Sequence, residues 1–88
     1  MYPFNQKKKG KYLIREFSKD VSSEELVWHR DKKDRIVRVM RGKDWYLQMD
    51  NQIPKKLLEG KTYYIPAYNY HRLIKGSDKL VVEIEEKL

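Results

Sequence analysis

The segment VWHRDKKDRIVRVMRG, residues 27–42, decides the fold because apolar residues alternate along it in the pattern of a β-strand. The same segment carries His29, one of two histidines in the chain, together with Asp31 and Arg35. These ionisable groups fall among candidate core positions, where charged side chains are rare unless they are paired or bind something.

Parity along this strand groups the side chains, since every second residue points to the same face. Arg35 shares its face with Val37 and Val39. If that face is the core face, Arg35 lies at the rim of the core, and the same interpretation starting from Val27 places the histidine and the aspartate there too. The opposite parity also contains apolar residues, so this assignment is not unique.

Short segments of period two, separated by turn residues, continue through the rest of the chain. The predicted strands are Tyr12–Phe17, Glu25–Arg30, Ile36–Met40, Trp45–Asp50, Tyr63–Ile65, Tyr70–Ile74 and Leu80–Glu85. The segment NQIPKKLLEG, residues 51–60, is typical of a loop with one helical turn capped by its glycine. The pattern predicts an all-β chain that closes into a small sandwich or barrel.

Length and composition narrow the function classes. A chain of 88 residues without internal repeats is one domain with a thin core, and we expect a homodimer that covers exposed sheet edges. The chain has no cysteine, which excludes disulfides and thiolate ligands, so any metal must bind histidine, carboxylate or carbonyl groups. No apolar run reaches the length of a signal peptide or a membrane span, and we expect a cytoplasmic protein.

The net charge of +7 favours acidic partners. Four lysines lie in residues 1–11, which we predict to be a basic N-terminal arm whose residues 5–10 do not pack, followed by a barrel domain over residues 12–88. Aromatic and basic residues alternate elsewhere in the chain in a way that would suit single-stranded nucleic acid. No RNP, KH or helix-turn-helix signature accompanies them.

The quoted segment resembles the first motif of the small single-domain cupins, in which a glycine precedes a His-x-His pair, a glutamate and a closing glycine. His29 and Gly42 match this motif. Ser23 stands at the first glycine, Asp31 at the second histidine and Arg35 at the glutamate.

The segment GKTYYIPAYNYHRLIK resembles the second cupin motif more closely. Gly60, Pro66 and His71 are in register, whereas Tyr68 stands at a glycine and Lys75 at an asparagine. The resemblance implies a small double-stranded β-helix, or jelly-roll, barrel.

In cupins the motif histidines and glutamate hold a divalent metal inside the barrel, so the resemblance implies that His29, Asp31 and His71 are metal ligands. Two histidines and one carboxylate resemble the facial triad that binds Fe(II), and Mn, Ni and Zn are the other candidate metals. No catalytic residue follows from the sequence, and whether the protein is an enzyme is left open.

Two interpretations stand open for Arg35. It either pairs with Asp31 in a structural ion pair, or binds the carboxylate of an organic acid that also ligates the metal. In the second case Arg35 and Tyr64 would contact the substrate. The sequence therefore predicts a cupin-like protein that binds a small molecule and a divalent metal at the barrel mouth. The alternative is a basic, non-enzymatic module that binds nucleic acid or another macromolecule.

Overall fold

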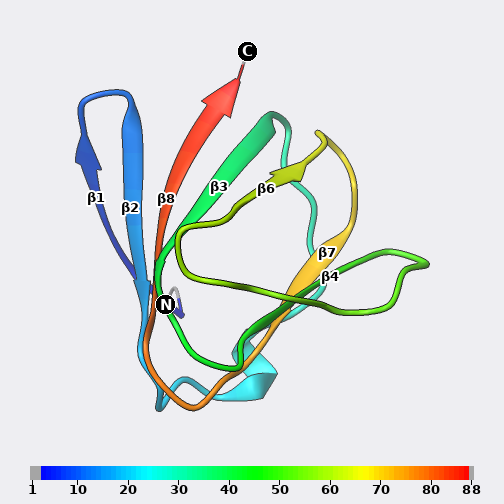
Figure 1. Ribbon diagram of the computed structural model, residues 1–88. Helices are drawn as coiled ribbons and strands as arrows, with labels where there is room; N and C mark the ends of the chain where they lie inside the picture. The colour runs from blue at the N-terminus through cyan, green and yellow to red at the C-terminus, as the bar shows by residue number, and fades with distance from the viewer. Residues whose placement is uncertain (1–2, 88) are drawn as a thin grey trace.

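Eight strands make up nearly all the regular structure of residues 3–87, the part of the chain that the computed structural model describes (Figure 1). The strands are β1 (Asn5–Lys9), β2 (Tyr12–Phe17), β3 (Asp34–Arg41), β4 (Tyr46–Met49), β5 (Lys55–Lys56), β6 (Thr62–Ile65), β7 (His71–Ile74) and β8 (Leu80–Lys87). One short 3-10 helix, η1 (Ser23–Glu25), precedes β3. The all-β prediction is confirmed.

The strands form two antiparallel sheets. The larger sheet has the order β1-β2-β8-β3-β6, and the smaller one has the order β5-β4-β7. From β3 onward the chain passes repeatedly between them, with β3, β6 and β8 in the larger sheet and β4 and β7 in the smaller one (Figure 1). This exchange of strands between two sheets is the jelly-roll arrangement that the motifs implied.

The core lies between the sheets and follows the period-two pattern. Leu80, Val82 and Ile84 alternate along β8 and are all nearly inaccessible. On β3, Val39 is fully buried while Met40 is 46% exposed. The face of β3 that bears Val39 is therefore the core face, which settles the parity of the segment that carries Arg35.

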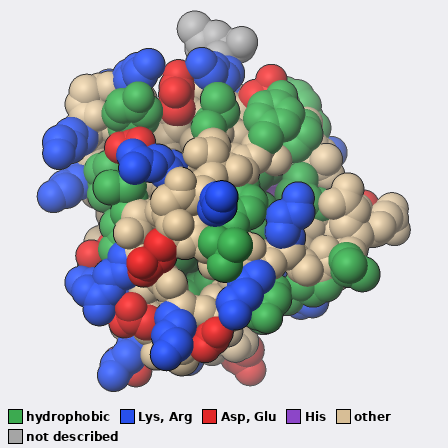
Figure 2. All heavy atoms as spheres, viewed as in Figure 1, with side chains coloured by type: hydrophobic (Ala, Val, Ile, Leu, Met, Phe, Trp, Pro, Cys, Tyr) green, Lys and Arg blue, Asp and Glu red, His purple; other side chains and the backbone are tan. Residues whose placement is uncertain are grey.

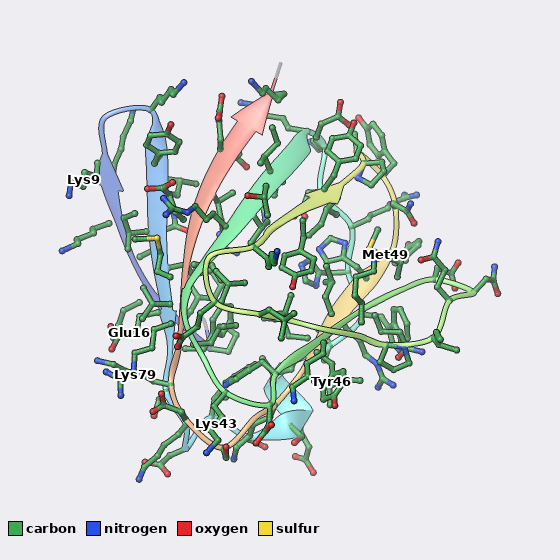
Figure 3. The ribbon with its side chains drawn as sticks, viewed as in Figure 1. Lys9, Glu16, Lys43, Tyr46, Met49 and Lys79 are labelled. Atoms are coloured by element: carbon green, nitrogen blue, oxygen red, sulfur yellow. The ribbon has the colours of Figure 1, made fainter. Side chains whose placement is uncertain are left out.

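The N-terminal segment is part of the larger sheet, so the prediction that residues 5–10 do not pack is wrong. β1 pairs with β2 along its whole length, and Gly10 forms the turn between them with a φ of +61°. The Phe4 ring packs 5.3 Å from that of Phe17. The lysines did not prevent pairing because their side chains can point into solvent, as Lys9 does (Figure 3), while the backbone extends the sheet. Residues 1 and 2 lie outside the described part of the chain.

The predicted strand at Glu25–Arg30 is also wrong, apart from one residue. Ser22 Oγ accepts a hydrogen bond from the Glu24 N–H at 3.2 Å, and this local bond starts the 3-10 turn. Extended pairing returns only at His29, which forms a single bridge to β7.

The helical turn predicted in residues 51–60 is absent from this described segment. Its backbone groups bind other strands instead: the Leu57 N–H donates to the Trp45 carbonyl at 2.9 Å, and the Gly60 N–H donates to the Val39 carbonyl at 2.8 Å. Non-local pairing therefore outweighs the local helix signal here. Within residues 3–87 there is no helix long and apolar enough to cross a membrane.

Candidate functional site

A two-residue backbone bridge brings the two histidines together. The His29 N–H donates to the His71 carbonyl at 3.0 Å, and the His71 N–H donates to the His29 carbonyl at 2.9 Å. Their rings meet edge to face, with centroids 4.3 Å apart. Residues separated by more than forty positions in sequence thus present their imidazoles to one place, at the start of β7.

Asp31 joins the histidines because its own backbone is fixed by the opposite loop. Its carbonyl accepts the Tyr68 N–H at 2.7 Å. Tyr68 has a φ of +62°, so the loop makes this contact in a left-handed conformation that most residues avoid. One ligand atom from each of His29, Asp31 and His71 can be chosen so that the three atoms lie within 4.8 Å of one another. The structure therefore assembles the three residues predicted as metal ligands.

Backbone carbonyls fix the tautomer of both imidazoles. His29 Nδ1 lies 3.0 Å from the Val27 carbonyl oxygen, and His71 Nδ1 lies 2.8 Å from that of Asn69. A carbonyl oxygen only accepts, so each Nδ1 carries a proton and donates it. In a neutral ring with its proton on Nδ1, Nε2 keeps its lone pair, which is the arrangement found when a histidine binds a metal through Nε2.

His71 is held neutral by its surroundings. Its side chain is buried, and this burial lowers the pKa of His71 below the ordinary value, although the hydrogen bond to the Asn69 carbonyl acts in the opposite direction. The nearby His29 and Arg35 also lower this pKa, while Asp31 raises it. Near neutral pH, His71 therefore offers a lone pair rather than a proton.

The Asp31 carboxylate has one buried oxygen that lacks a hydrogen bond from any residue within the described range 3–87. This atom, Oδ2, lies 3.3 Å from His71 Nε2. Because the His71 proton is on Nδ1, two lone pairs face each other across that distance. A buried acceptor without a donor is costly, and a bound cation would relieve it. The donor set of two imidazoles and one carboxylate therefore fits a divalent transition metal.

Arg35 does not bind the carboxylate of Asp31 in a two-pronged ion pair. One guanidinium nitrogen, Nη1, lies 3.3 Å from Asp31 Oδ2, too poorly aligned to count as a hydrogen bond. Nε and Nη2 instead donate to Glu86 Oε2 at 3.1 and 2.9 Å. Glu86 lies directly opposite Arg35 on β8 and supplies the main counter-charge.

A cavity of about 850 Å³ opens beside this cluster, between the two sheets. His29, Asp31, Arg35 and His71 are among the residues that line it. Tyr64, predicted as a substrate contact, does not line this cavity, and its side chain is 58% exposed. It lies on the opposite face of β6 from the buried Ile65. Four of the five proposed site residues are thus brought together.

The sequence analysis missed the residues that hold this cluster in place, namely Glu86 and the carbonyl groups of Val27 and Asn69. Carbonyl partners leave no residue-type signal in a sequence. Glu86 was visible as part of an acidic C-terminal run, but its role depends on the register between β3 and β8, which the sequence alone does not give.

Comparison with known proteins places this geometry in context. No family model and no curated protein match the chain. Solved structures do match: a cupin domain from Bordetella pertussis superposes with a TM-score of 0.65 and 21% identity, over 97% of this chain and 92% of that one. KdgF from Halomonas sp. superposes with a TM-score of 0.72 and 15% identity, over 98% of this chain and 82% of that one.

The chain has the cupin fold. Larger solved structures match it as well. Fe(II)-HppE, solved with an alternative substrate, has a TM-score of 0.64 and 14% identity over 92% of this chain, which spans about half (47%) of that protein. The chain spans about a third (35%) of a matching chain from crystal structures of DMSP lyases. The cluster of His29, Asp31 and His71 therefore lies in a cupin fold, at the positions that the two motifs marked.

Proposed function

We propose that this cupin binds one divalent transition metal through His29, Asp31 and His71 and takes a small-molecule ligand in the adjoining cavity. The observation that carries the proposal is the buried Asp31 Oδ2, which faces the unprotonated Nε2 of His71 at 3.3 Å. Arg35 Nη1 also lies 3.3 Å from this oxygen but makes no hydrogen bond to it, so the oxygen is available to a metal cation.

The ligand set supports Fe(II), Mn(II), Ni(II) and Zn(II) as candidates, because imidazole and carboxylate together suit these ions. One structural neighbour is named as an Fe(II) protein, which supports the proposal at the level of the fold. When bound, such an ion supplies a Lewis acid with positions left for a ligand oxygen.

The chain's own groups have separate tasks around that ion. The carbonyls of Val27 and Asn69 orient the two imidazoles, and burial keeps His71 unprotonated. Glu86 compensates the charge of Arg35, so that Asp31 is available as a ligand. Arg35 also lines the cavity, where its positive charge favours an anionic ligand.

Calorimetric titration of the purified, untagged protein with each of the four metals, under anaerobic conditions, tests the proposal. We expect binding of one ion per chain and its loss in His71→Ala. Arg72→Ala is the matched control, because Arg72 is the next residue on β7 and lies over the ring of Trp28 rather than in the cluster. Absence of binding by the wild type, or equal binding by His71→Ala, would refute the proposal.

A second candidate function is a basic module that binds single-stranded nucleic acid, and one surface favours it. Arg30 lies over the rings of Tyr68 and Tyr70, at 5.9 and 5.2 Å, and Arg72 lies 4.9 Å from the ring of Trp28. Lys and Arg side chains are also prominent at the edge of the molecule where β1 lies (Figure 2). Mixed aromatic and cationic surfaces of this kind bind bases and phosphates.

Salt dependence separates the two candidates. Phosphate contacts release counterions, so binding of a labelled oligonucleotide would weaken steeply between about 50 and 200 mM salt. A ligand held inside the barrel responds much less. Tight oligonucleotide binding with that steep dependence, lost on Arg30→Ala, would support the nucleic-acid module.

A further inference from the structure

The cavity is large for a chain of this length, and its walls are apolar. Its volume of about 850 Å³ falls within the range of pockets that hold drug-sized ligands. Both sheets contribute to the walls, which include Phe17, Val37, Leu47, Ile65, Leu73 and Ile84. A polar group of a ligand that lies against these apolar side chains would lose its water contacts and gain no hydrogen bonds there.

The polar groups of the cavity lie in two places. One is the cluster of His29, Asp31, Arg35 and His71. The other is on the side of β1 and β2, where Asn5, Gln6 and Arg15 line the cavity.

The Arg15 guanidinium is already engaged on that side. It donates to Gln6 Oε1 from Nε and Nη2, at 2.9 and 2.6 Å, and stacks 3.8 Å from the centre of the Phe4 ring. The only cluster of described residues in the cavity that includes a buried acceptor lacking a donor is therefore the one around Asp31.

The net charge of the cluster around Asp31 determines whether an anionic or a cationic ligand binds there. Asp31 and Glu86 contribute two negative charges, which oppose a divalent ion and the guanidinium of Arg35. The loaded cluster then retains one net positive charge in a partly buried place, and an anionic head group would neutralise it.

We infer that the ligand of this cavity is an apolar molecule with a single anionic head group, of the class of medium-chain carboxylic acids, with its head at the His29–Asp31–His71 end and its chain along the apolar walls. The inference rests on the proposed metal site and adds to it the class of ligand. Sugars and other polyhydroxylated molecules fit this cavity less well, because many of their hydroxyl groups would face apolar walls.

A chain-length series tests the inference on the wild-type protein. The metal-loaded protein is titrated calorimetrically with straight-chain carboxylates from butanoate to decanoate, and with glucuronate and octanol as comparison ligands. Each added methylene should increase the affinity about fourfold, as expected for burial of a CH₂ group. Glucuronate and octanol should each bind at least about tenfold more weakly than octanoate, the first for its hydroxyl groups and the second for its missing charge.

The outcomes separate the ligand class from the metal site. A flat chain-length series, or tighter binding of glucuronate than of octanoate, in protein that still binds metal would overturn the ligand class and leave the proposed function standing. Equal affinity for octanoate with and without metal would overturn the placement of the head group. Wild-type protein that binds none of the four metals would instead overturn the proposed function.

A pair of variants places the chain of the ligand inside the barrel. Val37→Phe puts a larger side chain into the cavity, whereas Ile36→Phe puts the same side chain on the opposite face of β3. Octanoate binding should fall at least about tenfold in Val37→Phe and stay within about twofold of wild type in Ile36→Phe. Thermal melting checks that both variants fold. Equal octanoate affinity in two folded variants would overturn the inference.

Discussion

Arg35 and Glu86 face each other across β3 and β8, and the Arg35 guanidinium donates two hydrogen bonds, from Nε and Nη2, to Glu86 Oε2. Arg35 occupies the position at which the first cupin motif has a glutamate. The neighbouring strand supplies a carboxylate in its place, and this carboxylate serves as the partner of the arginine. Because Glu86 balances the positive charge of Arg35, Asp31 does not have to balance it alone. The Asp31 carboxylate is then available to bind a metal.

Removing the carboxylate of Glu86 should therefore weaken the metal site. In Glu86→Gln, Arg35 loses its main counter-charge and turns to Asp31, so metal affinity should fall about tenfold or more. The free energy of unfolding should drop by about 1–3 kcal/mol, because a partly buried guanidinium loses its charged partner.

Metal titration and urea unfolding measure these two effects. Glu85→Gln is the matched control, since Glu85 is the adjacent residue on β8 and binds Lys87 at 2.8 Å instead of Arg35. A Glu86→Gln protein that binds metal as tightly as the control would show that the pair has no influence on the site.

Acidification should destabilise the metal-free protein through His71. Burial lowers the pKa of His71 in the folded state, so below about pH 6.5 the unfolded chain binds more protons than the folded one. The contribution of His71 to stability is thus complete above that pH and is lost as the pH falls toward the depressed pKa.

Urea unfolding of metal-free wild type and His71→Gln between about pH 7.5 and 5 measures this contribution. Wild type should lose more stability over this window than the variant, which has no imidazole at that position. Parallel pH dependences for the two proteins would contradict the lowered pKa. Metal affinity should fall over the same range, because protons then compete for the imidazole nitrogens.

Deletion of residues 1–9 should lower the melting temperature. β1 extends the larger sheet along the whole of β2, and Phe4 packs against the buried Phe17, so the deletion exposes both a sheet edge and part of the core. We expect a decrease of more than about 5 °C, the change that roughly 1 kcal/mol produces in a domain of this size.

Glutamine at positions 7, 8 and 9 is the control, because it removes the lysine charges and keeps the strand. Its melting temperature should stay close to that of wild type. If the truncated protein has the same melting temperature as the full chain, β1 adds no stability.

A homodimer is the expected oligomeric state. Large apolar side chains such as Trp28, Met40 and Tyr64 are between 42% and 58% exposed, and β1 and β6 are open edges of the larger sheet. A second copy would cover such surfaces. Sedimentation equilibrium at micromolar concentrations measures the association, which Met40→Lys should weaken. A monomer across that range would contradict the expectation.

The sequence predicted the parts of the fold in which local pattern and tertiary structure agree. The alternation of Leu80, Val82 and Ile84 predicted β8 and its buried face, and the two motifs marked His29, Asp31 and His71 as neighbours. Prediction failed where non-local pairing decided the outcome. The edge strand β1 was not predicted because its lysines give no alternating apolar pattern. The Arg35–Glu86 pair was not predicted because it depends on the register between β3 and β8, which no local pattern encodes.

The most direct test of the metal centre uses the fact that the chain contains two histidines and no others. A long-range proton–nitrogen correlation spectrum shows each ring separately, before and after addition of Zn(II). The account predicts that both rings carry their proton on Nδ1 in the metal-free protein, and that one equivalent of Zn(II) shifts the Nε2 resonances of both His29 and His71. Protonated Nε2 atoms, or Nε2 resonances that stay unchanged with Zn(II) in excess, would contradict it and leave the cluster as a structural ion pair at the barrel mouth.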